Sequence, residues 1–484
     1  MIADLTYDAG ITDHLSLKNR QPKEMLGEAL SPEGMKEPLQ TIPENSITPD
    51  LPVEGFMGSG PSIEIACENF YYNGSGYFMR EGDLFIPLTE GRVSKHLKKR
   101  GLSTKDVDLA ICHITAKHFV EWVGPMAGHR TGIHTDEDSG RQFLVTRPPQ
   151  IIESSPGDWE LVRRIVRGLF MTETYPDQFQ VVMGWVKQAR ENVKRGVRRP
   201  IPALAMVGPI NSGKTLFLEI IRLALGGRSA PAFRALTNEN GFNADILGAE
   251  LLTVDDQMAP RDKGARVRFG QAIKSQLFAS TLRVEEKHQN AFSTRPVHAL
   301  ALALNDEPQH VQVLPEMDPS LSDKITLIKT GRADFLPGET DDRERLMAQI
   351  KAEIPSFLHW LEQLEIPEHL CHPRTGIAAW HHPSVLAMLQ EISPENRLLE
   401  LINQCETFSP HLNVPGNPWR GTAAEMEGVL MEDPVTRSAT KTLTSWNGAI
   451  GTYLRRLIAK ASPIIRDGGQ RQGIQTWVIG NNEL

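Results

Sequence analysis

The stretch "AMVGPINSGKTLFLEII", residues 205–221, decides the fold of the central part of this chain. An apolar run leads into it, and Gly208, Gly213, Lys214 and Thr215 match the spacing G-x-x-x-x-G-K-[ST]. In that pattern, backbone N–H groups and the lysine bind phosphates at the start of a helix, while the hydroxyl contacts Mg²⁺. The sequence therefore predicts a buried strand, a phosphate-binding loop and a helix, with ATP and Mg²⁺ as ligands.

The loop expected to bind the nucleotide comprises Gly208, Pro209, Ile210, Asn211, Ser212, Gly213, Lys214 and Thr215.

Two further apolar runs end in polar side chains suited to hydrolysis. "GAELLTVDDQM" delivers Asp255 and Asp256, which we interpret as the metal ligand, together with Thr215, and the residue that activates water. A register shift by one residue would instead place Asp256 at the metal and Gln257 at the base position. "VHALALALNDEP" ends in Asn305, whose amide can hold the attacking water. Alternating strands and helices up to about residue 365 predict a parallel sheet covered on both faces.

A possible hairpin lies between these two runs. In "LRVEEKHQNAFSTRP" two short extended stretches flank Lys287 and His288. The pair would place a positive charge and an imidazole at the tip, where they can contact DNA. On composition alone a solvated charge cluster is the alternative, because Glu285 and Glu286 offset the lysine.

The carboxy-terminal segment predicts a winged helix over residues 421–484. "WRGTAAEMEGVLM" and "SWNGAIGTYLRRLIAKA" show helical spacing, and "PIIRDGGQRQGIQTWVIG" shows a hairpin with a glycine-rich turn. In a winged helix the second helix enters the major groove and the wing lies on the backbone. The DNA-binding candidates in this unit are Arg455, Arg456, Lys460, Arg466 and Arg471.

Bulk composition narrows the possible classes of protein. The chain of 484 residues has a formal charge of −8, so nucleic-acid contacts must come from local patches or from charges gathered by oligomerisation. Its four cysteines form no C-x-x-C pair, which favours a reducing compartment over a disulfide frame or zinc site. No apolar stretch approaches membrane-spanning length, and the amino terminus carries acids instead of a signal sequence.

The expected organisation has six parts. They are a mobile arm or linker over 1–60, a small α/β module over 61–150, a helical collar over 151–199, the nucleotide domain over 200–365, a connector over 366–420 and the winged helix over 421–484.

The residues quoted above resemble the superfamily 3 helicases. "GPINSGKT" and "EEKHQNAFSTRP…LALNDE" are similar to the phosphate loop, hairpin and sensor strand of the polyomavirus large T antigen helicase domain. "YYNGSGYFMREG", "FNADILGAELLTVDDQ" and "LPEMDPSLSDKITLIKTGR" resemble primase-helicases of phages, prophages and satellite elements. The resemblance implies an AAA+-like ring, usually hexameric, with ATP bound between subunits. It also implies that Lys287 and His288 grip single-stranded DNA in the pore and that Asn305 is the sensor.

The sequence departs from that pattern in two places. Lys324 stands where the family has an arginine finger, and Arg332 follows at the spacing of a second basic residue, so the residue acting on a neighbour's site could be either, or Arg198 or Arg199. The amino-terminal part lacks the acidic constellation of a primase and the His-x-His arrangement of a nicking enzyme. A separate primase or initiator is therefore an expected partner.

We accordingly expect an ATP-hydrolysing DNA helicase, acting on single-stranded and forked DNA in the bacterial host cytoplasm. The resemblance implies translocation from 3′ to 5′. Two alternatives share the same ATP site. One is a regulatory or defence ATPase that switches oligomeric state without unwinding, and the other is a DNA-binding initiator with negligible turnover.

Overall fold

The computed structural model describes residues 62–237, 243–257, 263–285, 291–391, 393–414, 416–444 and 446–480. The mobile arm expected over residues 1–60 lies outside these ranges. None of the helices within them is long and apolar enough to cross a membrane.

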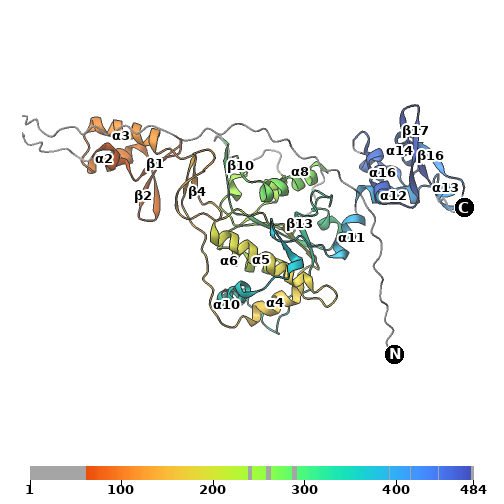
Figure 1. Cartoon of the computed structure of the whole chain (residues 1–484), viewed down its shortest axis with the longest axis horizontal. Helices are drawn as coiled ribbons and strands as arrows, with labels where there is room; N and C mark the ends of the chain where they lie inside the picture. Colours follow the sequence, from red (N-terminus) through yellow and green to blue (C-terminus); the bar gives the residue numbers. More distant parts are fainter. Residues whose placement is uncertain are drawn as a thin grey trace, which may run out of the picture. The chain divides into compact units, whose positions relative to one another are not determined.

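A five-stranded parallel sheet forms the centre of the nucleotide domain (Figure 1). Its strands are β7 (Ala203–Gly208), β8 (Ser229–Pro231), β9 (Leu251–Asp255), β12 (Ala299–Asn305) and β13 (Ile325–Lys329). They are ordered β13-β7-β12-β9-β8, and every neighbouring pair is parallel. The expected α/β class with a parallel sheet is therefore confirmed.

Alternation along β12 explains how this sheet packs on both faces. Ala299, Ala301 and Ala303 contribute to the core on one face, while the leucines between them contribute to the core on the other. Neighbouring β7 reverses the sizes, because Leu204 and Met206 occupy the face that holds the alanines of β12. Small side chains on one strand beside large ones on the next allow close packing without voids.

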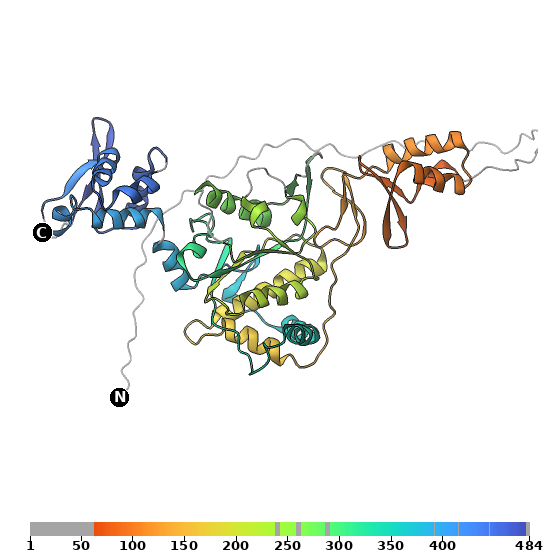
Figure 2. The same ribbon diagram turned by 180° about the vertical axis from the view of Figure 1, so that it is seen from behind.

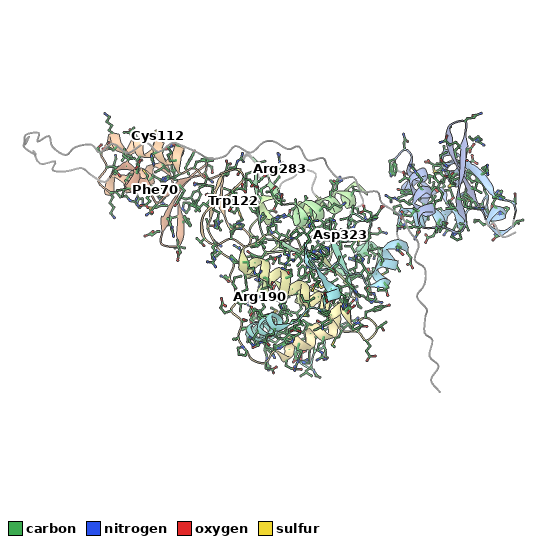
Figure 3. All side chains as sticks on the ribbon, in the orientation of Figure 1. Phe70, Cys112, Trp122, Arg190, Arg283 and Asp323 are labelled. Carbon is green, nitrogen blue, oxygen red and sulfur yellow. The ribbon has the colours of Figure 1, made fainter. Side chains whose placement is uncertain are left out.

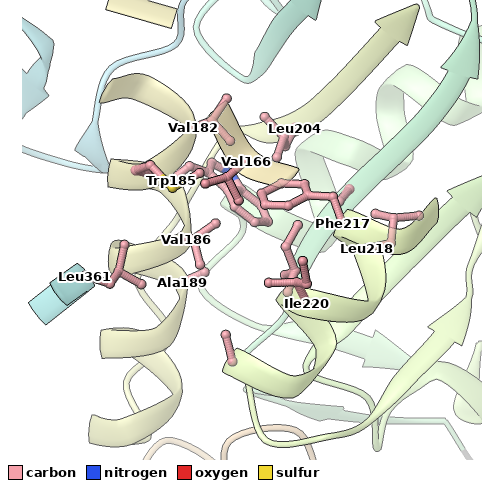
Figure 4. Close-up of a cluster of buried hydrophobic side chains, with 14 of the residues drawn as sticks. Val166, Val182, Trp185, Val186, Ala189, Leu204, Phe217, Leu218, Ile220 and Leu361 are labelled. Atoms are coloured by element: carbon pink, nitrogen blue, oxygen red, sulfur yellow. The ribbon is translucent and has the colours of Figure 1, made fainter. Parts of the chain in front are cut away.

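Four helices cover the first face: α4 (Glu160–Phe170), α5 (Asp177–Arg195), α6 (Lys214–Ala224) and α10 (Arg343–Gln363). The views from the front (Figure 1) and from behind (Figure 2) both show these helices on the same side of the sheet. Trp185 of α5 and Phe217 of α6 are fully buried in this layer (Figure 4), and the indole Nε1 of Trp185 donates to the Pro202 carbonyl at 2.6 Å. Residues 151–199, expected as a collar, thus supply two helices to the core of the nucleotide domain itself.

The second face is covered by α7 (Phe233–Thr237), α8 (Lys263–Ile273), α9 (Pro308–Val311) and α11 (Pro383–Glu391). Shorter elements complete the domain: the 3₁₀ turns Ala244–Ile246 and Glu368–Leu370, a π-helical turn Lys274–Phe278, and the strands β14 (Cys371–His372) and β15 (Gly376–Ile377).

The amino-terminal module comprises α1 (Ile63–Cys67), β1 (Phe70–Tyr72), β2 (Tyr77–Glu81), β3 (Leu84–Leu88), α2 (Glu90–Lys99) and α3 (Thr104–Lys117). The strands form an antiparallel sheet in the order β1-β2-β3, and Asn73 and Gly74 lie in the turn between β1 and β2. Its core is separate and ends at Ile114. Phe70 and Cys112 of this module are labelled in Figure 3.

A second small sheet follows, with strands β4 (Trp122–Gly124), β5 (Gly132–Thr135) and β6 (Gln142–Val145) in the order β4-β6-β5. Trp122, Phe143 and Val145 share a core with residues 247, 282, 284 and 292 of the nucleotide domain. The module expected over 61–150 is therefore two structures, and the later one packs on the nucleotide domain.

The carboxy-terminal unit contains α12 (Pro394–Gln404), α13 (Ser409–Asn413), β16 (Trp419–Thr422), α14 (Ala423–Glu432), α15 (Arg437–Leu443), α16 (Ala449–Ala459), β17 (Ile465–Arg471) and β18 (Ile474–Ile479). The three strands form an antiparallel sheet in the order β16-β18-β17. A capping box begins α14, because the Thr422 hydroxyl accepts from the Glu425 N–H while the Glu425 carboxylate accepts from the Thr422 N–H.

The residues 366–420, expected to form a connector, belong to the cores of the two neighbouring domains. Its first part packs on the nucleotide domain through Leu370, Ile377 and Val385. Its second part, from α12 onward, supplies Leu398 and Phe408 to the core of the carboxy-terminal unit. The apolar residues of α12 could not be assigned to either neighbour from periodicity alone.

This boundary predicts that a fragment of residues 393–484 folds alone and that a fragment of residues 421–484 does not. The shorter fragment lacks Leu398, Ile402 and Phe408, each of which is fully buried, and each such side chain contributes about 1.5–3 kcal/mol. Thermal unfolding followed by circular dichroism checks this. Equally cooperative transitions for both fragments would contradict the boundary.

Candidate nucleotide site and associated hairpin

The phosphate-binding loop follows directly from β7 and ends at the first residue of α6. Asn211 and Gly213 have φ angles of 56° and 104°, the left-handed conformation that builds an anion-binding nest of backbone N–H groups. Gly208 is also required, because a Cβ there would lie 2.1 Å from the Thr330 hydroxyl oxygen. The loop therefore has the backbone shape that a chain of phosphates needs.

Lys214 lies inside this loop and is 5% exposed. Its ammonium donates to the carbonyls of Gly208 at 3.0 Å and Pro209 at 2.7 Å, and to the Ser212 hydroxyl at 3.2 Å. Burial lowers the pKa of Lys214, while nearby Asp256 opposes that shift. The loop thus holds the cation on neutral oxygens, which a phosphate oxygen can replace.

Asp255 lies beside the first turn of α6. The Thr215 hydroxyl donates to its carboxylate at 3.2 Å, so the two expected metal ligands are adjacent. Burial raises the pKa of Asp255, the neighbouring Asp256 raises it further, and the Thr215 hydrogen bond lowers it. The Gln257 side chain donates to the Asp255 backbone carbonyl. This placement favours Asp255 and Asp256 as the working pair over the alternative register.

Asn305 connects the two halves of the site. Its amide oxygen lies 3.3 Å from the Lys214 Nζ, and its amide nitrogen donates to the Asp256 carboxylate at 3.3 Å. β12 pairs with β7 on one side and β9 on the other, so the end of β12 lies between the loop and the acids. An uncharged amide at this point can contact both a cation and an anion.

Arg332 lies against the phosphate loop of its own chain. Its guanidinium donates to the Ile210 carbonyl at 3.4 Å, and the next residue, Ala333, donates its N–H to the Ser212 carbonyl at 2.8 Å. Arg332 also lowers the pKa of Lys214. Its position therefore fits a role at its own nucleotide site instead of the expected role at a neighbour's.

Lys324 lies at the opposite edge of the sheet. It precedes β13, which runs parallel to β7, whereas the loop follows β7; a five-residue strand separates the two edges by about 16 Å. Its ammonium pairs with Asp323 at 2.6 Å and lies 5.2 Å from the centre of the Phe278 ring. Lys324 therefore cannot contact the nucleotide bound by its own chain.

The other two candidates for action on a neighbour have structural roles. Arg198 is partly buried and donates to the carbonyls of Gln276, Ala279 and Pro296, at 2.6, 3.1 and 2.6 Å. Burial lowers its pKa to about 10. Arg199 donates to two carbonyls at residues 373 and 374. Both guanidinium groups thus bond to carbonyls of their own chain, and the suggestion that either acts on a neighbour stays a prediction.

Arg198 at the same time anchors the predicted hairpin. Its three carbonyl partners lie before the first hairpin strand, β10 (Leu282–Val284), and after the second, β11 (Phe292–Thr294). The strands pair antiparallel, with Val284 opposite Phe292. The extended stretches expected on each side of the tip are confirmed. Lys287 and His288 themselves lie outside the described residues.

The sheet β4–β6 supports this hairpin from one side. Phe292 lies 5.5 Å from Phe143 and 6.5 Å from Trp122, measured between ring centres. Figure 3 labels Trp122 beside the hairpin residue Arg283. Asn243 completes the support, since its side chain accepts from the Glu285 N–H at 2.9 Å and donates to the Arg283 carbonyl at 2.9 Å. No sequence motif indicated that residues 122–145 support the hairpin.

Sequence reasoning also missed a contact between α4 and the loop after β13. A Cβ on Gly168 would lie 2.4 Å from the Arg332 carbonyl, and a Cβ on Gly331 would lie 2.5 Å from the Gly168 carbonyl. The Gly331 N–H donates to the Leu169 carbonyl at 2.8 Å. Because neither glycine has a side chain, α4 packs directly against the segment that carries Arg332. In the sequence, only the two glycines could have indicated this contact.

The basic residues of the carboxy-terminal unit differ in availability. Arg456 pairs with Glu316 and Glu395, and Lys460 pairs with Glu395 at 2.7 Å. Both therefore have a carboxylate partner on α12, and their expected role in binding DNA stays a prediction. Arg455 is exposed and bonds to the Gly451 carbonyl of its own helix.

The two candidates on the β17–β18 hairpin also have partners. Arg466 donates to the Gly480 carbonyl at 3.1 Å. Arg471 pairs with Glu425 at 2.6 Å, and both side chains are well exposed. An exposed ion pair contributes about 0–1 kcal/mol, so Arg471 can exchange this partner for a phosphate.

Comparison with known proteins gives two kinds of result. A family described as a family of unknown function (DUF5906) matches residues 206–319, which run from β7 to the segment before β13. The search of curated proteins found no match.

Among solved structures, the chain is similar to the C-terminal region of NrS-1, at 11% identity with a TM-score of 0.48, covering 85% of this chain and 94% of that one. It is similar to the JCV helicase at 13% identity and a TM-score of 0.25, covering 44% and 60% of the two chains. It is also similar to SCCmec type IV Cch, described as an active helicase, at 9% identity and a TM-score of 0.27, covering 79% and 70%.

The raised pKa of Asp255 predicts that Asp255→Asn increases the melting temperature of the nucleotide-free protein at neutral pH. The native pKa exceeds the unfolded value near 3.8, so the native state binds more protons and loses stability as pH rises between the two values. Asparagine removes that cost and still accepts from Thr215. Differential scanning calorimetry measures the change, with the exposed Asp83→Asn as control.

The gain from Asp255→Asn should shrink as the pH falls and vanish only well below about 3.8, where the aspartate is protonated in both states. A melting temperature below that of the parent at neutral pH would contradict the assigned burial cost.

Proposed function

We propose that this chain is an ATP-dependent DNA helicase of the superfamily 3 type, serving replication of a phage, prophage or satellite element in a bacterial host's cytoplasm. It assembles as an AAA+-like ring, hexameric as is usual in that family, and moves along single-stranded or forked DNA. The observation that carries the proposal is Asn305, placed between Lys214 and Asp256. The paired hairpin stem inserted between β9 and β12 supports it.

Each residue of the nucleotide site has its own role in ATP hydrolysis. Lys214 exchanges its loop carbonyls for phosphate oxygens, and the N–H groups of the loop bind the remaining phosphate charge. Thr215 and Asp255 would hold Mg²⁺, since hydroxyl and carboxylate oxygens are the ligands that this ion prefers. When bound, Mg·ATP supplies the γ-phosphoryl group that is transferred to water. Asp256 accepts the proton of that water, and Asn305 orients it.

The same contacts can couple hydrolysis to movement. Asn305 touches Lys214 and Asp256, so any displacement of either side chain by the nucleotide changes the hydrogen bonds at the end of β12. The hairpin is joined to β12 by the few residues after β11, and Arg198 binds the Pro296 carbonyl within them. A shift at Asn305 can therefore reach the hairpin only along β12, from its end to its start at Ala299, which the few residues after β11 join to the hairpin.

DNA loading is assigned to the carboxy-terminal unit, which we interpret as a winged helix. Its helices α14–α16 followed by the β17–β18 hairpin match that arrangement. Arg455 and Arg471 are the cations best placed to contact DNA, because one is exposed and the other holds only an exposed partner. Priming is left to a separate primase or initiator.

The division of roles predicts different losses for three variants. Lys214→Ala should abolish tight binding of a fluorescent ATP analogue. Asp256→Ala and Asn305→Ala should still bind it, but should reduce turnover about 100-fold or more, the usual effect of removing a group that prepares the attacking water. Asp83→Asn, an exposed position in the amino-terminal module, serves as the control for analogue binding. Full turnover by Asp256→Ala would show that the wrong acid is assigned.

The hairpin tip predicts a separation of ATP hydrolysis from unwinding. The double variant Lys287→Ala with His288→Ala should assemble and hydrolyse ATP at the basal rate but fail to separate forked DNA, because neither residue belongs to the nucleotide site. Arg283→Ala, which removes a charge from the stem instead of the tip, is the matched control. Strand separation is measured with a fluorophore and quencher on the two arms.

Unwinding by the double variant at the parent's rate would refute the pore assignment. If the parent assembles and hydrolyses ATP yet unwinds no fork, the chain is instead a nucleotide-switched regulatory ATPase.

A further inference from the structure

The antiparallel sheet β1–β3 has one face that the helices of its own module do not cover. Phe70, Tyr77, Met79 and Leu88 point toward α1–α3 and are buried with them. Because side chains alternate along a strand, the residues between these point to the opposite side. In Figure 1 the helices α2 and α3 lie together, and the β2–β3 hairpin extends beyond them.

This outer face carries aromatic rings in register. Tyr71 is paired with Phe78, Phe78 with Pro87, and Arg80 with Phe85. The rings of Tyr71 and Phe85 are 6.1 Å apart, and all three aromatic residues are partly exposed. None of the three belongs to the buried core of the module.

The strand positions on this face carry a positive charge, and the nearby carboxylate that acts on Tyr71 is Glu68, which precedes β1. Along β1–β3, strands that the structure describes completely, the outer positions carry Arg80 and no carboxylate, because Glu81 falls on the helix-facing side of the alternation. Arg80 is exposed, and its Nε donates to the Gly82 carbonyl at 3.0 Å. His118 extends the surface, with its ring 6.1 Å from that of Tyr71.

We propose that the outer face of β1–β3 binds single-stranded DNA, with bases stacked on Tyr71, Phe78 and Phe85 and a backbone phosphate on Arg80. Rings on a sheet surface stack on the faces of unpaired bases whatever their sequence, and a guanidinium beside them neutralises a phosphate. A duplex does not fit, since its bases are already stacked on one another. The site is separate from the nucleotide site and from the hairpin, and it gives the amino-terminal module a function of its own.

Substitutions on the full chain distinguish stacking from simple apolar contact. Phe78→Leu and Phe85→Leu keep an apolar side chain but remove the ring. Each should therefore weaken the binding of a fluorescent oligothymidine about tenfold. The binding is measured by fluorescence anisotropy in the absence of ATP. Phe78→Tyr and Phe85→Tyr keep a ring and should bind as the parent does. Leu109→Ala, an exposed apolar residue on α3, is the matched control for loss of apolar surface.

The cation is tested in the same way. Arg80→Ala should weaken oligothymidine binding and reduce its dependence on salt, because one phosphate contact is lost. Arg92→Ala removes an exposed arginine from α2, in the helix layer on the other side of the sheet, and should leave both quantities unchanged.

Photocrosslinking identifies the surface directly and needs no ATP hydrolysis, so it can succeed even if the chain is not a helicase. An oligonucleotide carrying bromodeoxyuridine should crosslink to Tyr71, Phe78 or Phe85, as mapped by mass spectrometry. Crosslinks found only elsewhere, or parental affinity in both leucine variants, would overturn the proposal. Equal losses for duplex and single strand, or tighter binding of oligouridine RNA than of oligothymidine, would overturn the assignment to single-stranded DNA.

Discussion

Parallel pairing of β12 with β7 on one side and β9 on the other is the constraint on which the candidate site depends. The phosphate loop follows β7, the two acids end β9, and Asn305 ends the strand between them. The side chains of the site lie close together, because the carboxyl ends of parallel strands meet at one edge of the sheet. The alternation of alanine and leucine along β12 makes that central position possible, since both faces of the strand are buried.

The same constraint explains which functional residues could be predicted from the sequence. Lys214, Asp255 and Asn305 each follow an apolar run that can only be a buried strand, so their convergence followed from the parallel sheet. The stem of the hairpin was predictable too, because two short extended stretches of similar length flank a polar tip. In each case local pattern and position in the fold agree.

What the sequence could not supply is the pairing of distant segments. Arg456 and Lys460 have the spacing of a DNA-reading helix face, yet Glu395, some sixty positions earlier, holds both of them. Arg198 looked like a free cation, but three carbonyls from two separate segments surround it. Nor could composition show that Phe143 supports Phe292, or that α12 belongs to the carboxy-terminal core. Each of these contacts joins residues whose separation carries no periodic signal.

This use of charge has a consequence for an acidic chain. Several basic residues that the sequence suggests as DNA contacts bond to carbonyls or carboxylates of their own chain. Contacts with DNA therefore depend on a few exposed cations. Repetition around a ring would multiply those positions, and a stacking surface adds affinity without adding charge. Both solutions let a protein with a net charge of −8 hold a polyanion.

The central claim is that ATP hydrolysis at the loop, acids and amide is coupled to a single strand of DNA. Steady-state ATPase turnover of the full chain, measured with no DNA, with oligothymidine and with a duplex of equal length, tests that coupling most directly. The account predicts a several-fold rise with the single strand and little change with the duplex. Turnover that is the same in all three conditions would contradict it.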